Sequence, residues 1–377
     1  MTKKQVYIVV RTLVKNGGLS KYVIDMYTTM AKISPNIELH LVLQNRHNQN
    51  RHNDYRDLLA EYGIHVHYIT SIQASLFQYV TEWRSLFKSH QIDIIHFQID
   101  NLVLFYPIML AKKMHVPRII IQSHNSWNDA VAKNPIKRWL HSYGKRRVGK
   151  WATDLYAVSK EAAKWLYDGS ALNRVQVIQN PVTVDKFKYS NRLRLQLRQQ
   201  LGLNNNVIYG HVGRFEIQKN HRFLLKVFRA ILERQPEVRL LLIGTGSLKS
   251  MIESQITDYG LTGKVLLLGR REDIANLMNA MDCIIFPSLY EGFPITLIEG
   301  QATGVPIICA DTIASSIAFL PTTKQLSLNQ PVDVWANLAV KEAAEPLGNR
   351  FRGNEITLNS GYDLKTQVEK MAAQYEY

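Results

Sequence analysis

Residues 282–306 read "DCIIFPSLYEGFPITLIEGQATGVP". The apolar run at the start predicts a buried strand, the residues around Gly292 a turn, and the remainder a helix, for which Pro294 suits the first position. Glu291 lies in the turn, and Glu299 follows eight residues later in the helix. A helix N-terminus attracts anions such as phosphate, and carboxylates accept hydrogen bonds from hydroxyl groups. This stretch therefore predicts a polar ligand site at the carboxyl end of a strand.

The same pattern of strand, turn and helix extends along the whole chain. Near-continuous apolar runs alternate with amphipathic segments such as 19–33 and 73–90, as in parallel sheets that are covered by helices on both faces. The predicted strands are residues 5–10, 38–43, 65–70, 93–98, 118–123, 154–159 and 175–180 in the first half, and 206–213, 238–244, 264–269, 282–287 and 305–310 in the second. The sequence therefore predicts the α/β class, as two Rossmann-like, doubly wound parallel-sheet domains that face a central cleft.

A change of composition marks the boundary between these domains. The stretch 180–194, "NPVTVDKFKYSNRLR", ends the first series of strands with Asn and Pro and continues into a charged helical pattern. We expect a first domain of residues 1–182 and a second of residues 183–361. The last segment, 362–377, has a helical pattern with no strand after it, so we expect it to pack back onto the first domain.

The composition is that of a globular protein of about two domains, with 377 residues, 46% hydrophobic and 20% charged. Both cysteines, Cys283 and Cys309, lie in apolar runs, so we expect core thiols in a reducing, cytoplasmic setting. The start of the chain reads as a first strand and not as a signal peptide, and the longest apolar stretch, 102–111, is too short to cross a membrane. The net charge of +15 indicates an acidic partner, which could be nucleic acid, a nucleotide phosphate or an anionic membrane.

Two further turns carry residues that suit phosphate. After the first strand, Gly17 and Gly18 precede a helix and could bring backbone N–H groups close to a phosphate, although a plain tight turn explains them equally well. In the second domain, Arg214 follows a strand and Lys219 precedes a helix, a placement that suits a diphosphate; the alternative is solvated surface charge. The chain lacks the G-x-G-x-x-G of dinucleotide-binding proteins, which disfavours a nicotinamide or flavin dehydrogenase.

Taken together, these segments resemble retaining GT-B glycosyltransferases of the GT4 type. The stretch "EGFPITLIE" (291–299) is similar to their E-x7-E motif. Other segments are similar to family segments in the same order, and they read "NGGLSKYV", "DIIHFQ", "RIIIQSHNS", "LYAVS", "VIQNPVTVDKF", "GHVGRFEIQKNH" and "LLLIGTGSL". The resemblance spans nearly the whole chain and implies a GT-B fold, with the acceptor bound by the first domain and a nucleotide sugar by the second.

The resemblance also implies roles for individual residues. The catalytic residues would be Glu291, His124, Arg214 and Lys219, with the two cations on the donor diphosphate and the histidine facing the sugar. The donor would be bound by Gly17, Gly18, Arg214, Lys219, Arg270, Glu291, Gly292, Phe293, Pro294, Leu297 and Glu299. Within this set, Glu299 would bind the ribose, Leu297 would lie near the phosphates, and the main chain at Arg270 would meet the nucleobase.

Two features of the sequence narrow the expected activity. After "PIICAD" (306–311) the chain departs from the Gly-Gly-x-x-Glu stretch of many GT4 members, and this version is similar to the branch found in capsule and exopolysaccharide gene sets. No D-x-D sequence is present to hold a divalent ion, so we expect a metal-independent reaction without a cofactor. The resemblance implies transfer of a hexose, with retention of anomeric configuration, from a nucleotide donor that we expect to be UDP-linked to a glycan acceptor that we expect to be lipid-linked.

Residues 130–151 contain seven Lys or Arg residues and no acidic residue, interleaved with aromatic side chains. Basic segments with aromatics suit an anionic membrane surface, where a lipid-diphosphate acceptor would lie. The residues expected on this membrane or acceptor surface are Lys137, Arg138, Lys145, Arg146, Arg147 and Lys150. We therefore expect a peripheral protein at the inner face of the membrane, with an ordinary solvated helix as the alternative.

Two other functions stay open at this point. A non-hydrolysing nucleotide-sugar epimerase would share the two-domain fold and the donor. A basic nucleic-acid-binding module would explain the net charge, but no helix-turn-helix, zinc or RNP-like pattern accompanies that charge, so we expect no nucleic-acid partner.

Overall fold

The computed structural model describes residues 3–14, 18–44, 55–291 and 293–376. The chain forms two compact units, one of Met1–Pro181 with Leu364–Tyr377 and one of Val182–Asp363. Each unit has one sheet, and all strand pairings within the two sheets are parallel. The predicted α/β class with two Rossmann-like sheets is therefore confirmed. The chain passes between the units after residues 181 and 363, whereas the sequence placed these limits after residues 182 and 361.

The sheet of the N-terminal unit has the strand order β3-β2-β1-β4-β5-β6-β7. Its strands are β1 (Lys4–Val10), β2 (Ile37–Leu43), β3 (His65–Tyr68), β4 (Ile94–Ile99), β5 (Arg118–Ser123), β6 (Asp154–Ala157) and β7 (Gln176–Val177). Strand β1 pairs with β2 on one side and with β4 on the other, so the order of the chain reverses there. Sheets of this kind bind ligands beyond the carboxyl ends of the strands near such a reversal.

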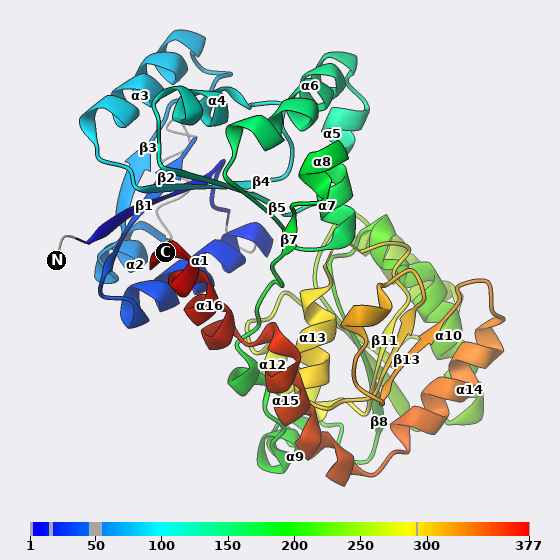
Figure 1. Ribbon diagram of the computed structural model, residues 1–377. Coiled ribbons are helices and arrows are strands. Elements are labelled where there is room, and N and C mark those ends of the chain that lie inside the picture. The colour runs from blue at the N-terminus through cyan, green and yellow to red at the C-terminus, as the bar shows by residue number, and fades with distance from the viewer. Residues whose placement is uncertain (1–2, 15–17, 45–54, 292, 377) are drawn as a thin grey trace. The chain divides into compact units, whose positions relative to one another are not determined.

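Helices cover both faces of this sheet (Figure 1). They are α1 (Gly18–Ile33), α2 (Arg56–Glu61), α3 (Leu76–Ser89), α4 (Tyr106–Lys113), α5 (Asp129–Ala132), α6 (Pro135–Trp151), α7 (Lys160–Leu166), α8 (Gly169–Leu172) and α16 (Leu364–Glu376). One core joins α3, α4, α6 and α7 to the sheet around Trp83, and a second joins α1, α2 and α16 to it around Met30. Helix α16 packs on α1 and buries Tyr375 completely. The C-terminal helix is thus part of the N-terminal unit.

The sheet of the C-terminal unit has the strand order β10-β9-β8-β11-β12-β13. Its strands are β8 (Val207–Val212), β9 (Val238–Ile243), β10 (Val265–Gly269), β11 (Cys283–Phe286), β12 (Ile307–Ala310) and β13 (Thr323–Leu326). The sequence did not predict β13, because this short edge strand, "TKQL", is polar and only half-buried over most of its length. Its pairing with β12 comes from the sheet that is already in place, and not from an apolar run of its own.

The helices and short helical turns of the C-terminal unit also form two layers. They are η3 (Val184–Phe187), α9 (Asn191–Gln200), η4 (Ile217–Lys219), α10 (His221–Arg234), α11 (Lys249–Asp258), α12 (Ile274–Ala280), α13 (Ile295–Ala302), η5 (Ser315–Ile317), α14 (Val332–Ala343), η6 (Leu347–Arg350), α15 (Phe351–Thr357) and η7 (Leu358–Tyr362). One core contains α9, α12 and α13, and the other contains α10, α11 and α14. The two cysteines are free thiols buried in these cores.

Side-chain caps decide where several helices begin. The Ser75 hydroxyl accepts a hydrogen bond from the N–H of Gln78 at the start of α3 (3.2 Å). In the basic segment, the Asn134 side chain accepts from the N–H of Lys137 (3.0 Å), and Pro135 occupies the first turn of α6. This cap separates α6 from α5. Within the described residues, no helix is both long enough and apolar enough to span a bilayer.

Candidate active site

Three neighbouring strand ends of the C-terminal unit carry most of the predicted site. Strand β8 lies between β9 and β11, so the turns that follow these three strands leave the same edge of the sheet. The turn after β8 contains Arg214 and Lys219, and the turn after β11 contains Glu291. The parallel arrangement therefore brings together residues that are far apart in the chain.

Glycines allow the turns after β8 and β9 to pack backbone against backbone. The N–H of Phe215 donates to the carbonyl of Thr245 (2.9 Å). A Cβ at Gly244 would collide with the carbonyl of Gly213, and a Cβ at Gly246 would collide with that of Phe215. Gly244 also has a φ of +146°, which side chains rarely tolerate. The two glycines of "IGTGS" therefore fix the position of the turn that carries Arg214 and Lys219.

Lys219 and Glu291 form a buried ion pair. The Lys219 Nζ lies 2.6 Å from the Glu291 Oε1, and the two side chains are only 12% and 6% exposed. The same ammonium lies 4.6 Å from the centre of the Phe286 ring, within reach of a cation–π interaction. A lysine ammonium has three N–H donors, so the pairing with Glu291 leaves donors for a phosphate. Lys219, the residue predicted to bind the diphosphate, is thus in direct contact with Glu291, the residue predicted to bind the sugar.

Gln218 is a site residue that the sequence analysis missed. Its side-chain amide donates to the Glu291 Oε2 (3.1 Å) and to the carbonyl of Tyr290 (2.9 Å). The backbone carbonyl of Gln218 accepts from the N–H of Leu289 (2.8 Å). Gln218 and Lys219 together hold both oxygens of the Glu291 carboxylate. The sequence offered no signal for this role beyond the position of Gln218 next to Lys219, because its partners lie in a distant turn.

Two buried histidines lie behind Lys219. The rings of His211 and His221 pack edge to face with their centres 4.9 Å apart, and both residues are at most 1% exposed. Burial, together with the charges of its neighbours, lowers the pKa of His221 to about 4 and holds the pKa of His211 well below its usual range. Both histidines are therefore neutral at physiological pH. The two rings therefore add no positive charge next to Lys219.

Helix α13 begins one residue later than the sequence predicted. Pro294 has a ψ of 83°, which is not helical, so it precedes the helix, and Ile295 is the first helical residue. Leu297 has its side chain in the core and donates its N–H to the carbonyl of Pro294 (2.9 Å). Glu299 is 7% exposed and lies one turn along the helix. Phe293 is half-buried beside the ring of Tyr362.

The other donor-binding candidates lie at separate turns. Arg214 is exposed two residues after the end of β8, and Arg270 is exposed directly after β10. Gly18 is the first residue of α1. Gly17 and Gly292 lie outside the described residues.

His124 belongs to the N-terminal unit, where it directly follows β5. Its Nε2 lies 2.5 Å from the Gln98 Oε1, and its ring packs edge to face on Tyr22 at 4.9 Å between ring centres. Burial lowers the pKa of His124 to about 3, so the ring is neutral at physiological pH. A neutral imidazole has one donor and one acceptor nitrogen, which suits a hydroxyl group.

The basic helix α6 exposes both its charged and its large apolar side chains. Ile136 is 69% exposed, Trp139 is 66% exposed, and Trp127, which precedes α5, is 60% exposed. Of the six predicted contact residues, five are exposed, namely Lys137, Arg138, Arg146, Arg147 and Lys150. Lys145 is half-buried, and its ammonium donates to the carbonyl of Lys164 (2.6 Å). Exposed apolar side chains among cations are typical of surfaces that bind another protein or a membrane.

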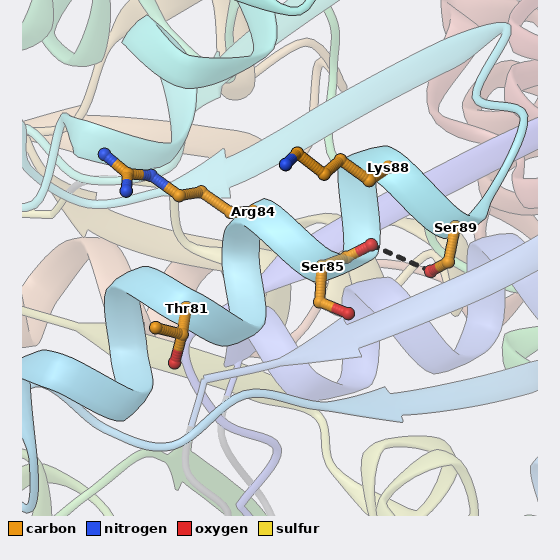
Figure 2. Close-up of a pocket in the computed structure, with 5 residues that line it drawn as sticks. All are labelled: Thr81, Arg84, Ser85, Lys88 and Ser89. Carbon is orange, nitrogen blue, oxygen red and sulfur yellow. Dashed lines mark hydrogen bonds between the residues drawn. The ribbon is translucent and has the colours of Figure 1, made fainter.

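A depression on α3 does not form a competing site. Its lining residues are Thr81, Arg84, Ser85, Lys88 and Ser89, all exposed on one helix. Figure 2 shows the hydroxyl of Ser89 donating to the carbonyl of Ser85 (2.8 Å), a bond within the helix itself. Because these side chains do not converge from different elements, they do not enclose a ligand. Across the described residues, His, Cys, Asp and Glu do not gather in any group of three or more that could hold a metal ion.

Comparisons of the sequence with protein families agree with this arrangement. Residues 16–186 match the family described as Glycosyltransferase Family 4, and residues 194–316 match the family described as Glycosyl transferases group 1. A protein of Bacillus subtilis (strain 168) named as a glycosyltransferase, EpsF, is 31% identical over 321 residues, which cover 83% of each chain. The UDP-Gal:alpha-D-GlcNAc-diphosphoundecaprenol alpha-1,3-galactosyltransferase of Escherichia coli is 28% identical over 309 residues, covering 77% of this chain and 76% of that protein.

Solved structures share the fold at low sequence identity. Anabaena HepE in complex with UDP-glucose superimposes with a TM-score of 0.77 and 19% identity, covering 99% of both chains. WaaG, a glycosyltransferase involved in lipopolysaccharide biosynthesis, superimposes with a TM-score of 0.68 and 15% identity, covering 98% of this chain and 99% of that one. The predicted GT-B fold is confirmed.

Proposed function

Because this chain belongs to the GT4-type glycosyltransferases, we propose that it transfers a hexose from a UDP-linked donor to a lipid-linked glycan acceptor, with retention of configuration. The observation that carries this proposal is the cluster of Lys219, Gln218 and Glu291 at adjoining strand ends. In this cluster, Lys219 is a cation that can bind a phosphate, and it contacts Glu291, a carboxylate that can accept from a sugar hydroxyl. The expected product is part of a surface polysaccharide, since one relative is named for Vi polysaccharide biosynthesis and another for capsular polysaccharide biosynthesis.

The leaving diphosphate would be stabilised by the charges of the protein. Arg214 and Lys219 would bind its oxygens, and the N-terminus of α13 would add the positive end of a helix dipole. These groups supply the charge that a divalent cation supplies in other transferases, so we propose a metal-independent reaction without a cofactor. The acceptor would attack from the face of the leaving group, whose phosphate oxygen would take the acceptor proton.

The remaining residues would hold the other parts of the donor. Glu291, with Gly292, Phe293 and Pro294, would bind the transferred sugar, and His124 would face it. Glu299 would accept hydrogen bonds from the ribose, and the main chain at Arg270 would meet the nucleobase. One structural neighbour, HepE, was crystallised both with UDP and with UDP-glucose, which supports a uridine donor. The galactosyltransferase relative, named for a diphosphoundecaprenol acceptor, supports a lipid diphosphate on the acceptor.

We further propose that α6 attaches the protein to the cytoplasmic face of an anionic membrane. Ile136, Trp139 and Trp127 would enter the interface between headgroups and acyl chains, and the five exposed cations of α6 would contact lipid phosphates. This placement would bring a lipid-linked acceptor close to the enzyme.

Product analysis tests the reaction. Purified protein would be incubated with UDP-sugars, with and without a lipid-diphosphate glycan, in excess EDTA. We expect sugar transfer that requires the acceptor and persists in EDTA. Conversion of the UDP-sugar without any acceptor would identify an epimerase instead. Activity that is lost in EDTA and restored by Mg²⁺ or Mn²⁺ would contradict the account of the leaving group, and tight, salt-sensitive binding of DNA or RNA without sugar transfer would identify a nucleic-acid-binding protein.

Vesicle binding tests the membrane surface. Replacing Lys137, Arg138, Arg146 and Arg147 with Gln should weaken binding to anionic vesicles by about 1 kcal/mol per charge near the surface, while activity on a soluble acceptor survives. Lys145 is left in place because its ammonium holds the carbonyl of Lys164. Unchanged vesicle binding would leave α6 as an ordinary solvated helix.

A further inference from the structure

Behind His124, buried polar side chains form an unbroken chain of hydrogen bonds. The Gln98 Oε1 lies 2.5 Å from the His124 Nε2, and the Gln98 Nε2 donates to the Tyr27 hydroxyl (2.8 Å). The Tyr27 hydroxyl lies 3.2 Å from that of Tyr375, which lies 2.6 Å from the Nδ1 of His96. The four residues behind His124 are at most 2% exposed. Water therefore does not compete for these bonds.

The amide of Gln98 gives this chain a direction. Its nitrogen donates to Tyr27, so its oxygen, which can only accept, faces His124. The Nε2 of His124 must then carry the ring proton. Tyr27, which accepts from Gln98, donates to Tyr375, and Tyr375 donates to His96. In this direction each of the four bonds has one donor and one acceptor, and the ring proton of His96 lies on its Nε2, for which the structure records no partner among the described residues.

We infer that Gln98, Tyr27 and Tyr375 are positioning residues for His124. They hold its ring as the neutral Nε2–H tautomer, which leaves the Nδ1 as a hydrogen-bond acceptor. Within the described residues, the structure records a hydrogen bond to His124 at Nε2 and none at Nδ1. The Nδ1 is thus able to accept from a hydroxyl group of a sugar. The role in sugar recognition rests on the proposed function, whereas the tautomer does not.

The chain of hydrogen bonds also assigns a role to the C-terminal helix. Tyr375 lies in the last turn of α16, and its neighbour Gln374 is held at its backbone carbonyl and at its side-chain oxygen. Arg118 donates to the backbone carbonyl of Gln374, and the Tyr156 hydroxyl donates to its side-chain oxygen (2.9 Å). The last turn of α16 is therefore fixed to the sheet. Through Tyr375 and the hydrogen bonds that follow it, this turn also holds the ring of His124.

The tautomer is tested by ¹⁵N spectra of histidine-labelled protein without any ligand. The His124 signals are assigned by their loss in His124→Gln. We expect the wild-type pattern of an Nε2–H tautomer. In Gln98→Leu, which removes both bonds at similar size, and in the milder Tyr27→Phe, we expect a mixture of both tautomers. In Gln98→Leu, kcat should also fall about ten-fold, the factor that corresponds to about 1.4 kcal/mol, without a matching loss of UDP affinity.

Tyr167→Phe is the matched control, because it also removes a buried hydroxyl from this unit. That hydroxyl donates to the carbonyls of Ile121 (2.7 Å) and Tyr156 (2.9 Å), outside the chain of bonds. We expect the His124 spectrum to stay unchanged in this variant. An Nδ1–H tautomer in the wild type, or an unchanged spectrum in Gln98→Leu and Tyr27→Phe, would overturn the inference. A changed spectrum with unchanged kcat would support the inference and contradict the proposed role of His124 in the reaction.

Discussion

The two units place different chemistry at the carboxyl ends of their sheets. In the C-terminal unit, Lys219 and Glu291 form a buried ion pair that Gln218 holds in place. In the N-terminal unit, His124 is neutral and is held by the uncharged amide of Gln98. A fixed charge stabilises a group whose charge grows during a reaction, whereas a neutral donor and acceptor orient a hydroxyl group. Under the proposed function, the C-terminal unit would bind the diphosphate, and His124 of the N-terminal unit would orient an uncharged part of the substrate.

The ion pair also changes what can be expected of single substitutions. If a phosphate-binding lysine and a sugar-binding carboxylate were far apart, replacing one would not change the surroundings of the other. Lys219 and Glu291 touch at 2.6 Å, so removing either one leaves a charge with little solvent around it. We call Lys219, Gln218 and Glu291 the charged region, and His124 with Gln98 the neutral region. Four predictions test whether the two regions differ as proposed, from the largest expected effect to the smallest.

Lys219→Met should have the largest effect, because it removes a cation from the leaving group and the partner of Glu291. We expect kcat/KM to fall about a hundred- to a thousand-fold, as when one charge-stabilising donor is removed from other enzymes. Steady-state rates with the UDP-sugar measure it. Lys226→Met, at an exposed position of α10, is the control and should change little. A loss below about ten-fold would mean that Lys219 is not central to the charged region.

Glu291→Gln and Glu299→Gln should fail in different ways. Glu291→Gln should lower kcat about ten-fold or more and leave the affinity for free UDP within about three-fold, since Lys219 keeps its charge for the phosphates. Glu299→Gln should weaken UDP itself by about 1.5–3 kcal/mol, through loss of a charged acceptor for the ribose. Calorimetric titration of UDP beside steady-state rates separates the two. Equal losses of UDP affinity in both variants would contradict the division of roles.

Gln218→Ala should lower kcat about ten-fold, because Glu291 loses one of the two groups that hold its carboxylate. The affinity for UDP should hardly change, since Gln218 is proposed to act on Glu291 and not on the phosphates. Gln218→Glu should be worse than Gln218→Ala, because it places a second negative charge beside Glu291. Gln199→Ala, at an exposed position of α9, provides the control. If Gln218→Glu is fully active, Gln218 does not position Glu291.

Acid should lower the free energy of unfolding of the N-terminal unit through His124. The pKa of His124 falls from about 6.5 in the unfolded chain to about 3 in the folded protein. The stability that this shift contributes is present above pH 6.5 and is lost as the pH falls toward the folded pKa, because the unfolded chain then binds the proton first. At about pH 5, His124 should account for a loss of about 1–2 kcal/mol, which His124→Gln should abolish. Five of the six tryptophans lie in the N-terminal unit, so their fluorescence during urea unfolding at about pH 7 and about pH 5 reports on it. Equal pH dependence in both proteins would contradict a neutral His124.

Most of the strands could be predicted because each is a short apolar run between turn residues. Strand β13 could not, since its half-exposed polar residues have no pattern of their own and depend on β12 for pairing. The start of α13 was wrong by one residue, because Pro294 fits either side of a helix start and only its backbone angles decide. Errors of this kind occur where local preference is weak and the surrounding fold determines the conformation.

The sequence by itself determined the two parallel sheets and the residue types at their carboxyl ends, including Glu291, Lys219 and His124. Apolar periodicity and strand-end turns are local properties, so they can be read along the chain. Only the tertiary structure decided which of these groups touch. The Gln218 amide meets a carboxylate 73 residues away, and Tyr375 meets His96 across 279 residues. Hydrogen bonds need their atoms within a few tenths of an ångström, and that precision exists only after sheets and helices have packed.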